Sequence, residues 1–373
     1  MPTGIDRVER AYLRHLLSDN VPLFGLVRTR AGYLLVDGQG LAAFLQRLKD
    51  DGRWPRSDLL SRLGRDADTA AQAETFLRRH AVARALPPGL PRLLRRRLPP
   101  DLTYFNVGHS NLTARVLNAM YEAGVCGHVM IHDVIPLLHP CFQREGTEER
   151  FRAALARVSE KADRIIYTSR DTQTRTEPYL RQMGRVPSSV VAHLGVELVE
   201  PDLGTSVPSG PYFVTVGTIE PRKNHRFLLD LWSQLGPDPP KLLICGTRGW
   251  RNEDVFAALD ALPAEGPVKV IQGLTDPALA RLMQCSAGLL FPSLAEGFGY
   301  PPLEAAGYGT RVLCNTLPVL REVLGKKVDF VSVNDSQSWL RKIQNWARTH
   351  NEAEQTKAFH PPTWADHFNT VLR

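Results

Sequence analysis

The stretch Phe291-Pro-Ser-Leu-Ala-Glu-Gly-Phe-Gly-Tyr-Pro-Pro-Leu-Glu-Ala-Ala-Gly307 decides how the rest of the chain is interpreted. The apolar run 287–291 is long enough for a buried strand, and two glycines separate it from a helical pattern that opens near Pro301. Proline is tolerated in the first turn of a helix, because its missing N–H would have no partner there. The stretch therefore predicts a strand, a glycine-rich loop and a helix, with Glu296 on the loop and Glu304 in the first turns of the helix.

The predicted loop ends at a helix N-terminus, where free backbone N–H groups and the helix dipole favour a bound anion. Two carboxylates on either side of a phosphate cradle suit a ligand that has hydroxyls at both ends and phosphate in the middle. A nucleotide-sugar is such a ligand. The spacing of Glu296 and Glu304 alone also fits a bland interpretation, a solvated loop acid and a first-turn acid that the dipole stabilises.

This stretch resembles the acid-x7-acid signature of family-4 retaining glycosyltransferases, which have the two-domain GT-B fold. Glu296 and Glu304 match its two acids, and the flanking Phe-Pro-Ser, Gly-Phe-Gly and Ala-Ala-Gly make the match specific. The resemblance implies that Glu296 binds hydroxyls of the donor sugar at the catalytic centre and that Glu304 binds the nucleotide ribose. It also implies donor contacts from the glycine loop and the start of the helix, at Gly297, Phe298, Gly299 and Tyr300.

A second strand–turn–helix pattern begins at Tyr212–Val216 and continues as Gly217-Thr218-Ile219-Glu220-Pro221-Arg222-Lys223-Asn224. Two adjacent cations at such a turn suit a diphosphate, because arginine can bind its oxygens bidentately and lysine adds a point charge. Surface charge at a helix start explains the same residues when they are taken alone. The segment resembles the diphosphate motif of the family's second domain. The resemblance implies a catalytic role for Arg222 and Lys223 and donor contacts from Gly217 and Thr218.

Strands and helices alternate regularly over residues 103–200, with predicted strands at Thr103–Val107 and His128–Ile135. This alternation with short links predicts a parallel sheet covered by helices on both faces. Ligands of such sheets lie outside the C-terminal ends of the strands, where His109 and His132 are expected. His132 resembles the histidine that many family-4 enzymes place beside the donor sugar, which implies a catalytic role, and His109 is a further candidate for donor binding. A purely structural histidine is an open alternative for both.

Gly4 opens the first helical pattern of the chain and resembles the glycine of a Gly-Ile-x-Arg-Val motif, which implies contact with the donor. In the family this motif follows the first strand, so that strand is expected to be missing here, either because the start is misassigned or because the sheet has lost an element. The runs Leu23–Val27 and Tyr33–Val36 predict a strand pair. Residues 52–101 are rich in arginine and interrupted by prolines, which predicts an irregular insertion near the acceptor side.

A length of 373 residues favours two domains. The segment 201–210 is rich in Pro, Gly and Ser and is expected to be the linker. The expected fold class is α/β with the GT-B architecture, two Rossmann-like domains whose parallel sheets face each other across a cleft. Residues 1–200 are expected to form the acceptor-side domain and 211–345 the nucleotide-sugar domain. The resemblance implies that 346–373 form a helical segment that packs back on the first domain.

The net charge of +7 comes from the first domain, because residues 201–373 carry 17 basic and 17 acidic side chains. A basic first domain favours contact with an anionic membrane surface or an anionic acceptor, although a solvated basic face explains the charge equally well. The chain has no apolar run of about 18 residues and no secretory signal at its start, so a cytoplasmic location, peripheral at the inner membrane face, is expected. The five scattered cysteines do not resemble a zinc site, and no metal, other cofactor or nucleic acid is expected.

Together these patterns predict a retaining glycosyltransferase that needs no metal. It would move a sugar from a nucleotide-diphosphate sugar to a glycan or lipid-linked acceptor in surface polysaccharide biosynthesis, for example O-antigen synthesis. The resemblance of the first domain to capsule and O-antigen enzymes favours a GDP-mannose-like donor. One alternative is a sugar-nucleotide epimerase or phosphorylase of the same fold, and another is a non-catalytic protein that binds nucleotide-sugars.

Overall fold

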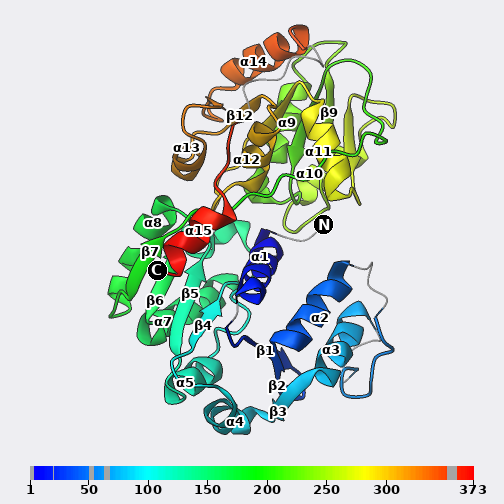
Figure 1. Ribbon diagram of the computed structural model, residues 1–373. Coiled ribbons are helices and arrows are strands. Elements are labelled where there is room, and N and C mark those ends of the chain that lie inside the picture. Colours follow the sequence, from blue (N-terminus) through cyan, green and yellow to red (C-terminus); the bar gives the residue numbers. More distant parts are fainter. Residues whose placement is uncertain (1–3, 20, 50–53, 63–67, 351–358) are drawn as a thin grey trace.

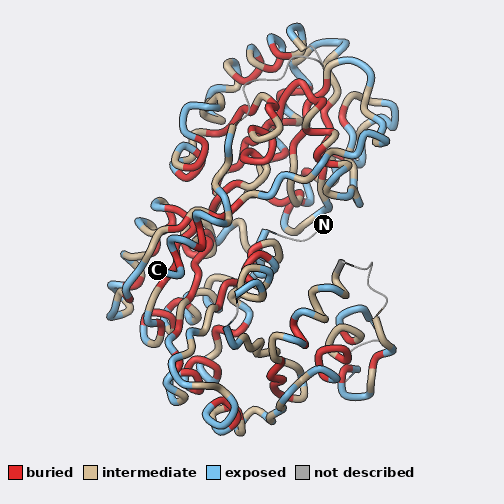
Figure 2. Tube along the Cα trace, in the orientation of Figure 1, coloured by how far each residue is buried: buried red, intermediate tan, exposed pale blue. Residues whose placement is uncertain are grey.

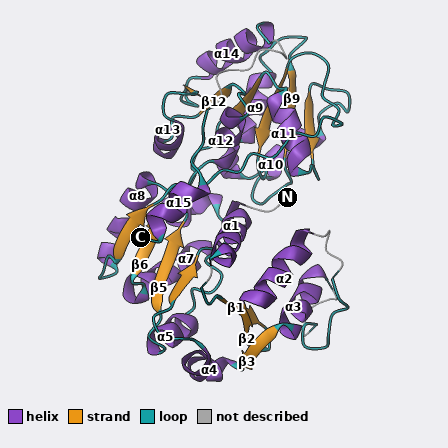
Figure 3. Ribbon diagram, viewed as in Figure 1, coloured by secondary structure: helices purple, strands orange, loops and turns teal. Residues whose placement is uncertain are grey.

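The computed structural model describes residues 4–19, 21–49, 54–62, 68–350 and 359–373. Two α/β lobes are stacked one above the other in Figure 1, and the chain passes from the first to the second at about residue 200. Figure 3 shows that each lobe has a sheet with helices packed around it. The predicted α/β class with parallel sheets is confirmed.

The second domain is built on a six-stranded parallel sheet with the strand order β10-β9-β8-β11-β12-β13. Its central strands are buried on both faces (Figure 2), which explains their nearly continuous apolar sequence. The strands are β8 (Tyr212–Val216), β9 (Lys241–Cys245), β10 (Val268–Ile271), β11 (Gly288–Phe291), β12 (Val312–Cys314) and β13 (Asp329–Phe330). The helices are α9 (His225–Trp232), α10 (Glu253–Asp260), α11 (Asp276–Gln284), α12 (Tyr300–Gly307), α13 (Pro318–Leu324) and α14 (Ser336–Arg348).

The first domain contains a four-stranded parallel sheet in the order β4-β5-β6-β7. Its strands are β4 (Thr103–Asn106), β5 (Cys126–Ile131), β6 (Arg164–Tyr167) and β7 (Ser188–Val191). The helices between them are α5 (Ala114–Glu122), α6 (Ile135–Leu138), α7 (Thr147–Lys161) and α8 (Arg170–Gln182). The strand predicted over 128–135 was extended too far, because Pro136 lies in the first turn of the short helix α6.

The N-terminal part of the chain adds helix α1 (Gly4–Ser18) and a separate antiparallel sheet in the order β1-β2-β3. The predicted strand pair is confirmed as β1 (Phe24–Thr29) and β2 (Gly32–Asp37), with α2 (Gly38–Lys49) next. Among the described residues no strand precedes α1, and β4 lies at the open edge of its sheet.

The described part of 52–101 is regular, which corrects the prediction of an irregular insertion. It forms α3 (Thr69–Arg79), β3 (Ala81–Ala85) and α4 (Leu90–Arg97), while 52–53 and 63–67 lie outside the described residues. In α4 the apolar face carries Leu90, Leu93 and Leu94, which are buried, whereas its arginines point to solvent. The high arginine content hid this amphipathic pattern, because each apolar position is flanked by charge.

The last helix, α15 (Trp364–Val371), returns to the first domain and lies next to β7 in Figure 1. Nδ1 of His367 donates to the carbonyl of His193 at 3.0 Å, and its Nε2 accepts the hydroxyl of Tyr12 at 2.8 Å. The expected C-terminal segment began at 346, but residues 346–348 are the last turn of α14 in the second domain, and 351–358 lie outside the described residues.

Candidate active site

The end of β8 and the loop after β11 bring one acid and two cations together. Glu296 accepts Nζ of Lys223 at 2.6 Å and forms an ion pair with Nη1 of Arg222 at 2.7 Å. Arg222 is held from its other side by Glu220, whose Oε1 lies 2.6 Å from Nη2. The C-terminal ends of neighbouring parallel strands meet at one edge of the sheet, so residues 73 positions apart in sequence come into contact.

The two cations set the charge state of Glu296. Burial opposes ionisation of this carboxyl, but the charges of Arg222 and Lys223 outweigh burial and lower its pKa to about 2. Burial lowers the pKa of Lys223, which the charge of Glu296 partly opposes. The cluster therefore contains two cations and two acids, and it is electrically balanced before any ligand arrives.

Gly217 and Thr218 form the turn that leads from β8 to this cluster. Gly217 has φ +141°, and a side chain there would come within 3.1 Å of Cε of Lys223. Glycine thus lets the backbone pass beneath the lysine. The methyl group of Thr218 packs on Gly249, where an added Cβ would lie 2.7 Å away.

Gly297 lies at a close contact between the two domains. A Cβ at this position would lie 2.5 Å from the carbonyl oxygen of His132 and 2.9 Å from Cβ of Asp133, so no other residue fits. The carbonyl of Gly297 lies 3.3 Å from the hydroxyl of Thr168 and 3.4 Å from that of Thr172. The loop that carries Glu296 is therefore docked on the first domain through its backbone.

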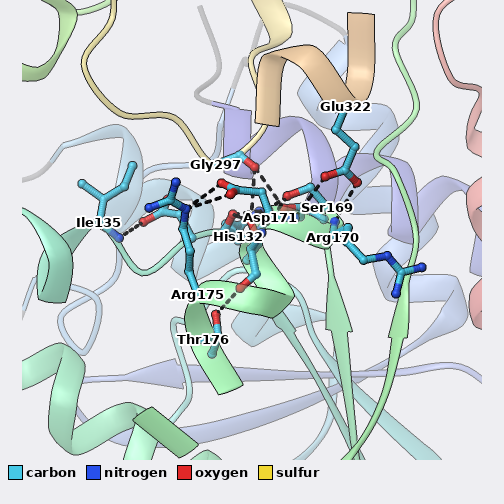
Figure 4. A network of polar contacts seen from close by, with 12 residues as sticks. His132, Ile135, Ser169, Arg170, Asp171, Arg175, Thr176, Gly297 and Glu322 are labelled. Carbon is cyan, nitrogen blue, oxygen red and sulfur yellow. Dashed lines mark hydrogen bonds and ion pairs between the residues drawn. The ribbon is translucent and has the colours of Figure 1, made fainter. Parts of the chain in front are cut away.

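Glu322 of α13 makes a second contact between the domains at the start of α8. Its carboxylate accepts the backbone N–H groups of Arg170 at 2.7 Å and Asp171 at 3.0 Å, as Figure 4 shows. It also accepts Nε2 of His193 at 2.9 Å. A carboxylate at a helix N-terminus is stabilised by free N–H groups and by the dipole, so this contact helps to hold the two domains together.

The residues after Gly297 differ in what their side chains face. The side chain of Phe298 is buried in the core between the rings of His193 and Tyr300, with centroids 6.2 and 5.5 Å away, and its expected contact with a donor stays a prediction. Gly299 caps α12 with φ +99°, and a Cβ there would lie 2.5 Å from Leu320. The hydroxyl of Tyr300 is buried and has no hydrogen-bond partner among the described residues.

Helix α1 of the first domain meets α12 of the second at their N-terminal ends. A Cβ at Gly4 would lie 3.5 Å from the ring of Tyr300. One turn later, Nη1 of Arg7 pairs with Oε1 of Glu304, and its Nη2 lies 3.5 Å from Oδ1 of Asp276. Burial raises the pKa of Glu304, and the charge of Arg7 opposes this effect. Arg7, Glu304, Asp276 and Tyr300 line a cavity of about 220 Å³.

The rings of His109 and His132 are both hydrogen-bonded to backbone carbonyl groups. Nε2 of His132 donates to the carbonyl of Val107 and Nε2 of His109 to that of Met130, both at 2.7 Å. Burial and the nearby His109 lower the pKa of His132 to about 4, so its ring is neutral at pH 7. The side chains that line the small cavity of about 50 Å³ beside Glu296 include those of Asp133, Thr172 and Arg175.

Sequence reasoning missed three residues of this region: Arg7, Asp133 and Glu322. Arg7 is one helical turn after Gly4, which could have indicated that it lies at the same helix end. Burial raises the pKa of Asp133, although the backbone N–H of Ile135 and the charge of Arg222 oppose this effect. No pattern in the sequence pointed to Glu322, because its partners lie on another domain.

Two further observations on the described ranges of the chain bear on function. Their His, Cys, Asp and Glu side chains nowhere form a group of three or more that could hold a metal ion. None of the helices in the same ranges combines the length and the apolar character that crossing a membrane requires.

Residues 205–359 match the family model of the glycosyl transferases group 1. The serotype-specific mannosyltransferase WbdA of Escherichia coli is 28% identical over 252 residues, which are 62% of this chain and 31% of WbdA. The O-antigen chain mannosyltransferase RfbU of Salmonella typhimurium is 26% identical over 224 residues, 58% of this chain and 60% of RfbU. The chain thus spans about a third of the length of WbdA.

The fold is similar to that of HepE from Anabaena, whose crystal structure contains UDP and glucose. The two structures agree with a TM-score of 0.53 at 18% identity, over 76% of each chain. At this identity the likeness concerns the fold alone. The chain has two stacked α/β domains in the GT-B arrangement, and its second domain is similar to the glycosyl transferases group 1.

Proposed function

We propose that this protein is a retaining mannosyltransferase of surface polysaccharide biosynthesis. It transfers mannose from a GDP-mannose-like donor to a hydroxyl of a glycan or lipid-linked acceptor, and it needs no metal. The mannosyl donor and the O-antigen setting are supported by the names of the relatives, WbdA and RfbU. A nucleotide-sugar donor is supported by the site itself.

The observation that carries the proposal is the joint contact of Arg222 and Lys223 with Glu296 at the start of the loop before α12. Eight residues later, Glu304 lines a cavity of about 220 Å³ at the other end of the same segment. A donor laid along this segment has its ribose at Glu304, its diphosphate at the helix end and its sugar at Glu296. The small cavity beside Glu296 and Asp133 marks the end of this segment at which the sugar and the acceptor hydroxyl would meet.

In the reaction, negative charge develops on the β-phosphate as the bond to the sugar breaks. Arg222, Lys223 and the backbone N–H groups of Gly297–Gly299 stabilise that charge, and fixed donors of this kind are usually the largest single contribution to catalysis. Glu220 and Glu296 hold the two cations in place beforehand, so little reorganisation is needed. The contact at Gly297 brings the first domain over the sugar and limits the access of water.

The experiment is a donor screen with the purified protein. GDP-mannose, UDP-glucose, UDP-GlcNAc and dTDP-rhamnose are each offered with mannosylated glycan and polyprenyl-linked acceptors, and the released nucleotide is measured. The proposal expects release from GDP-mannose that depends on the acceptor. Isomerised donor without acceptor would identify an epimerase, phosphate-dependent release a phosphorylase, and binding without any turnover a binding protein.

Peripheral contact with an anionic membrane is a separate part of the proposal. The basic end of α4 supports it, because Arg95, Arg96 and Arg97 are all exposed there. Binding to vesicles of phosphatidylglycerol should weaken as salt rises, because salt screens the attraction. Replacing the three arginines with serine should weaken binding at low salt. Vesicle binding that changes neither with salt nor with this replacement would contradict a peripheral contact with the membrane.

A further inference from the structure

The nucleotide end of the proposed donor site is shared by the two domains. The cavity of about 220 Å³ is lined by α1 of the first domain on one side and by α11 and α12 of the second domain on the other. Figure 1 shows α1 at the junction of the two lobes. A cavity of about 150 Å³ is enough to hold a benzene molecule, so this one has room for part of a nucleoside. The cavity is complete only while the two domains are in contact.

Two acids of the second domain meet one cation of the first domain in this cavity. Nη1 of Arg7 pairs with Oε1 of Glu304, and Nη2 of the same guanidinium lies 3.5 Å from Oδ1 of Asp276. The guanidinium carbon also lies 5.9 Å from the centre of the Tyr300 ring. Three side chains of the second domain therefore contact Arg7, and a single guanidinium faces both carboxylates.

The surroundings of Glu304 make Arg7 its counter-ion. The other titratable side chains that line the cavity are those of Arg10, Arg14, Glu197, Tyr300 and Tyr308. Arg14 is paired with Glu197 at 2.9 Å, and the hydroxyl of Tyr308 donates to the carbonyl of Val199 at 2.9 Å. Among the residues that the structure describes, Arg7 is the only cation that forms an ion pair with Glu304 or with Asp276.

Glu304 depends on this counter-ion because it is buried, with an exposed fraction of 7%. Burial and the charge of Asp276 raise the pKa of its carboxyl, whereas the charge of Arg7 and its hydrogen bond lower that pKa. Removing one partner of a buried ion pair leaves the other charge uncompensated, and a buried carboxylate then becomes neutral by taking up a proton. Without Arg7, the carboxyl of Glu304 would therefore stay protonated up to a higher pH.

We propose that Arg7 is a positioning residue for the donor, which keeps the carboxylate of Glu304 ionised and fixed so that it can accept the hydroxyls of the ribose. This role rests on the proposed function, which places the ribose at Glu304. Arg7 occupies Oε1, and Oε2 is then the acceptor for the ribose. A protonated carboxyl would be a weaker acceptor, because hydrogen bonds to charged groups are the stronger ones. An ion pair that merely joined the domains would not make nucleotide binding depend on pH.

The test measures the affinity of Arg7→Gln for GDP by calorimetry between pH 6 and pH 9. At pH 6 the affinity should be about tenfold or more below that of the wild type, since one hydrogen bond to a charged group is lost. This deficit should shrink by at least about threefold towards pH 9, because the carboxyl of Glu304 ionises again as the pH rises. Arg7→Lys keeps a cation beside Glu304 and should return the pH dependence to that of the wild type.

Pyrophosphate, which lacks the ribose, separates this role from a general loss of positive charge. Arg7→Gln should bind it as the wild type does, which would also show that the variant is folded around the diphosphate site. Arg152→Gln removes an exposed cation that is paired with Glu148 on α7 and should leave the affinity for GDP unchanged. Adding Arg7→Gln to Glu304→Gln should weaken GDP binding little further, because the two residues act through one contact.

Four results would overturn the proposal. They are an unchanged affinity of Arg7→Gln for GDP at pH 6, an equal deficit at pH 6 and pH 9, an equal loss of pyrophosphate binding, and losses of Arg7→Gln and Glu304→Gln that add up in full. A wild type that binds UDP in place of GDP would contradict the mannosyl donor only, and the variants are then compared with UDP, because both nucleotides carry the ribose. A wild type that binds neither nucleotide would contradict both proposals.

Discussion

Replacing Glu296 by glutamine removes the anion that Arg222 and Lys223 share while it keeps the shape of the side chain. The structure sets the expected size of the effect. The pKa of this carboxyl falls from its usual 4.5 to about 2, which corresponds to about 3 kcal/mol in favour of the ionised form in the folded state. Removing one partner of a buried ion pair typically costs about 3–5 kcal/mol. We therefore expect Glu296→Gln to lower the free energy of unfolding by about 3 kcal/mol at pH 7.5.

The dependence on pH has a definite sign. Because the pKa of Glu296 is lower in the folded state, its contribution is complete above about pH 4.5 and is lost as the pH falls towards 2. The difference between the wild type and Glu296→Gln should therefore be constant above pH 5 and should shrink below pH 4.5. Urea denaturation followed by tryptophan fluorescence at several pH values measures it.

The control is Glu265→Gln, which removes an exposed acid that lies 3.6 Å from Lys269. Surface pairs of this kind contribute about 0–1 kcal/mol, so stability should hardly change. Pyrophosphate should stabilise Glu296→Gln more than the wild type, because two buried cations then lack one of their anions. A loss below about 1 kcal/mol, or equal stabilisation of both proteins by pyrophosphate, would refute the charge arrangement described here.

Three further predictions follow from the same site. Glu304→Gln should weaken the binding of free GDP and of GDP-mannose by similar factors, about tenfold to a hundredfold, as measured by calorimetry; an unchanged affinity for both ligands would rule out the ribose contact. Arg222→Ala and Lys223→Ala should each lower kcat by about 10²-fold or more in the nucleotide-release assay, and wild-type turnover in both variants would disprove the diphosphate assignment. Activity should survive EDTA, whereas abolition with rescue by manganese would reveal a metal site.

The sequence was sufficient to predict the parts of the site that lie at strand ends. Glu296, Arg222 and Lys223 each follow a predicted parallel strand. The C-terminal ends of parallel strands lie at the same edge of the sheet, and this does not depend on how the helices are packed. The pairing of Arg7 with Glu304 could not be predicted, because it depends on how the two domains are packed. His132 lies at the C-terminal end of its strand as expected, although the predicted strand continued to Ile135. Its hydrogen bond to Val107 depends on a rotamer that a sequence does not specify.

The fold, like the site, could be predicted only in part from the sequence. The alternation of strands and helices over 103–200 predicted the parallel sheet, because each apolar run has a length that fits a strand. Helix α4 was missed, because its three buried leucines are embedded among arginines. The cavity of about 420 Å³ beside β4 could not be predicted from sequence patterns either. An open sheet edge becomes visible only when the order of the strands is known.

The most direct test of the proposed function is the anomeric configuration of the first product. Purified protein is incubated with GDP-α-D-mannose and a mannosylated acceptor, and the anomeric configuration of the new glycosidic linkage is determined by proton NMR. The account predicts an α-linked mannose, formed at a rate that falls by about 10²-fold or more in Lys223→Ala. A β-linked product would contradict the retaining mechanism. Undiminished transfer by Lys223→Ala would contradict the role given to the cluster around Glu296.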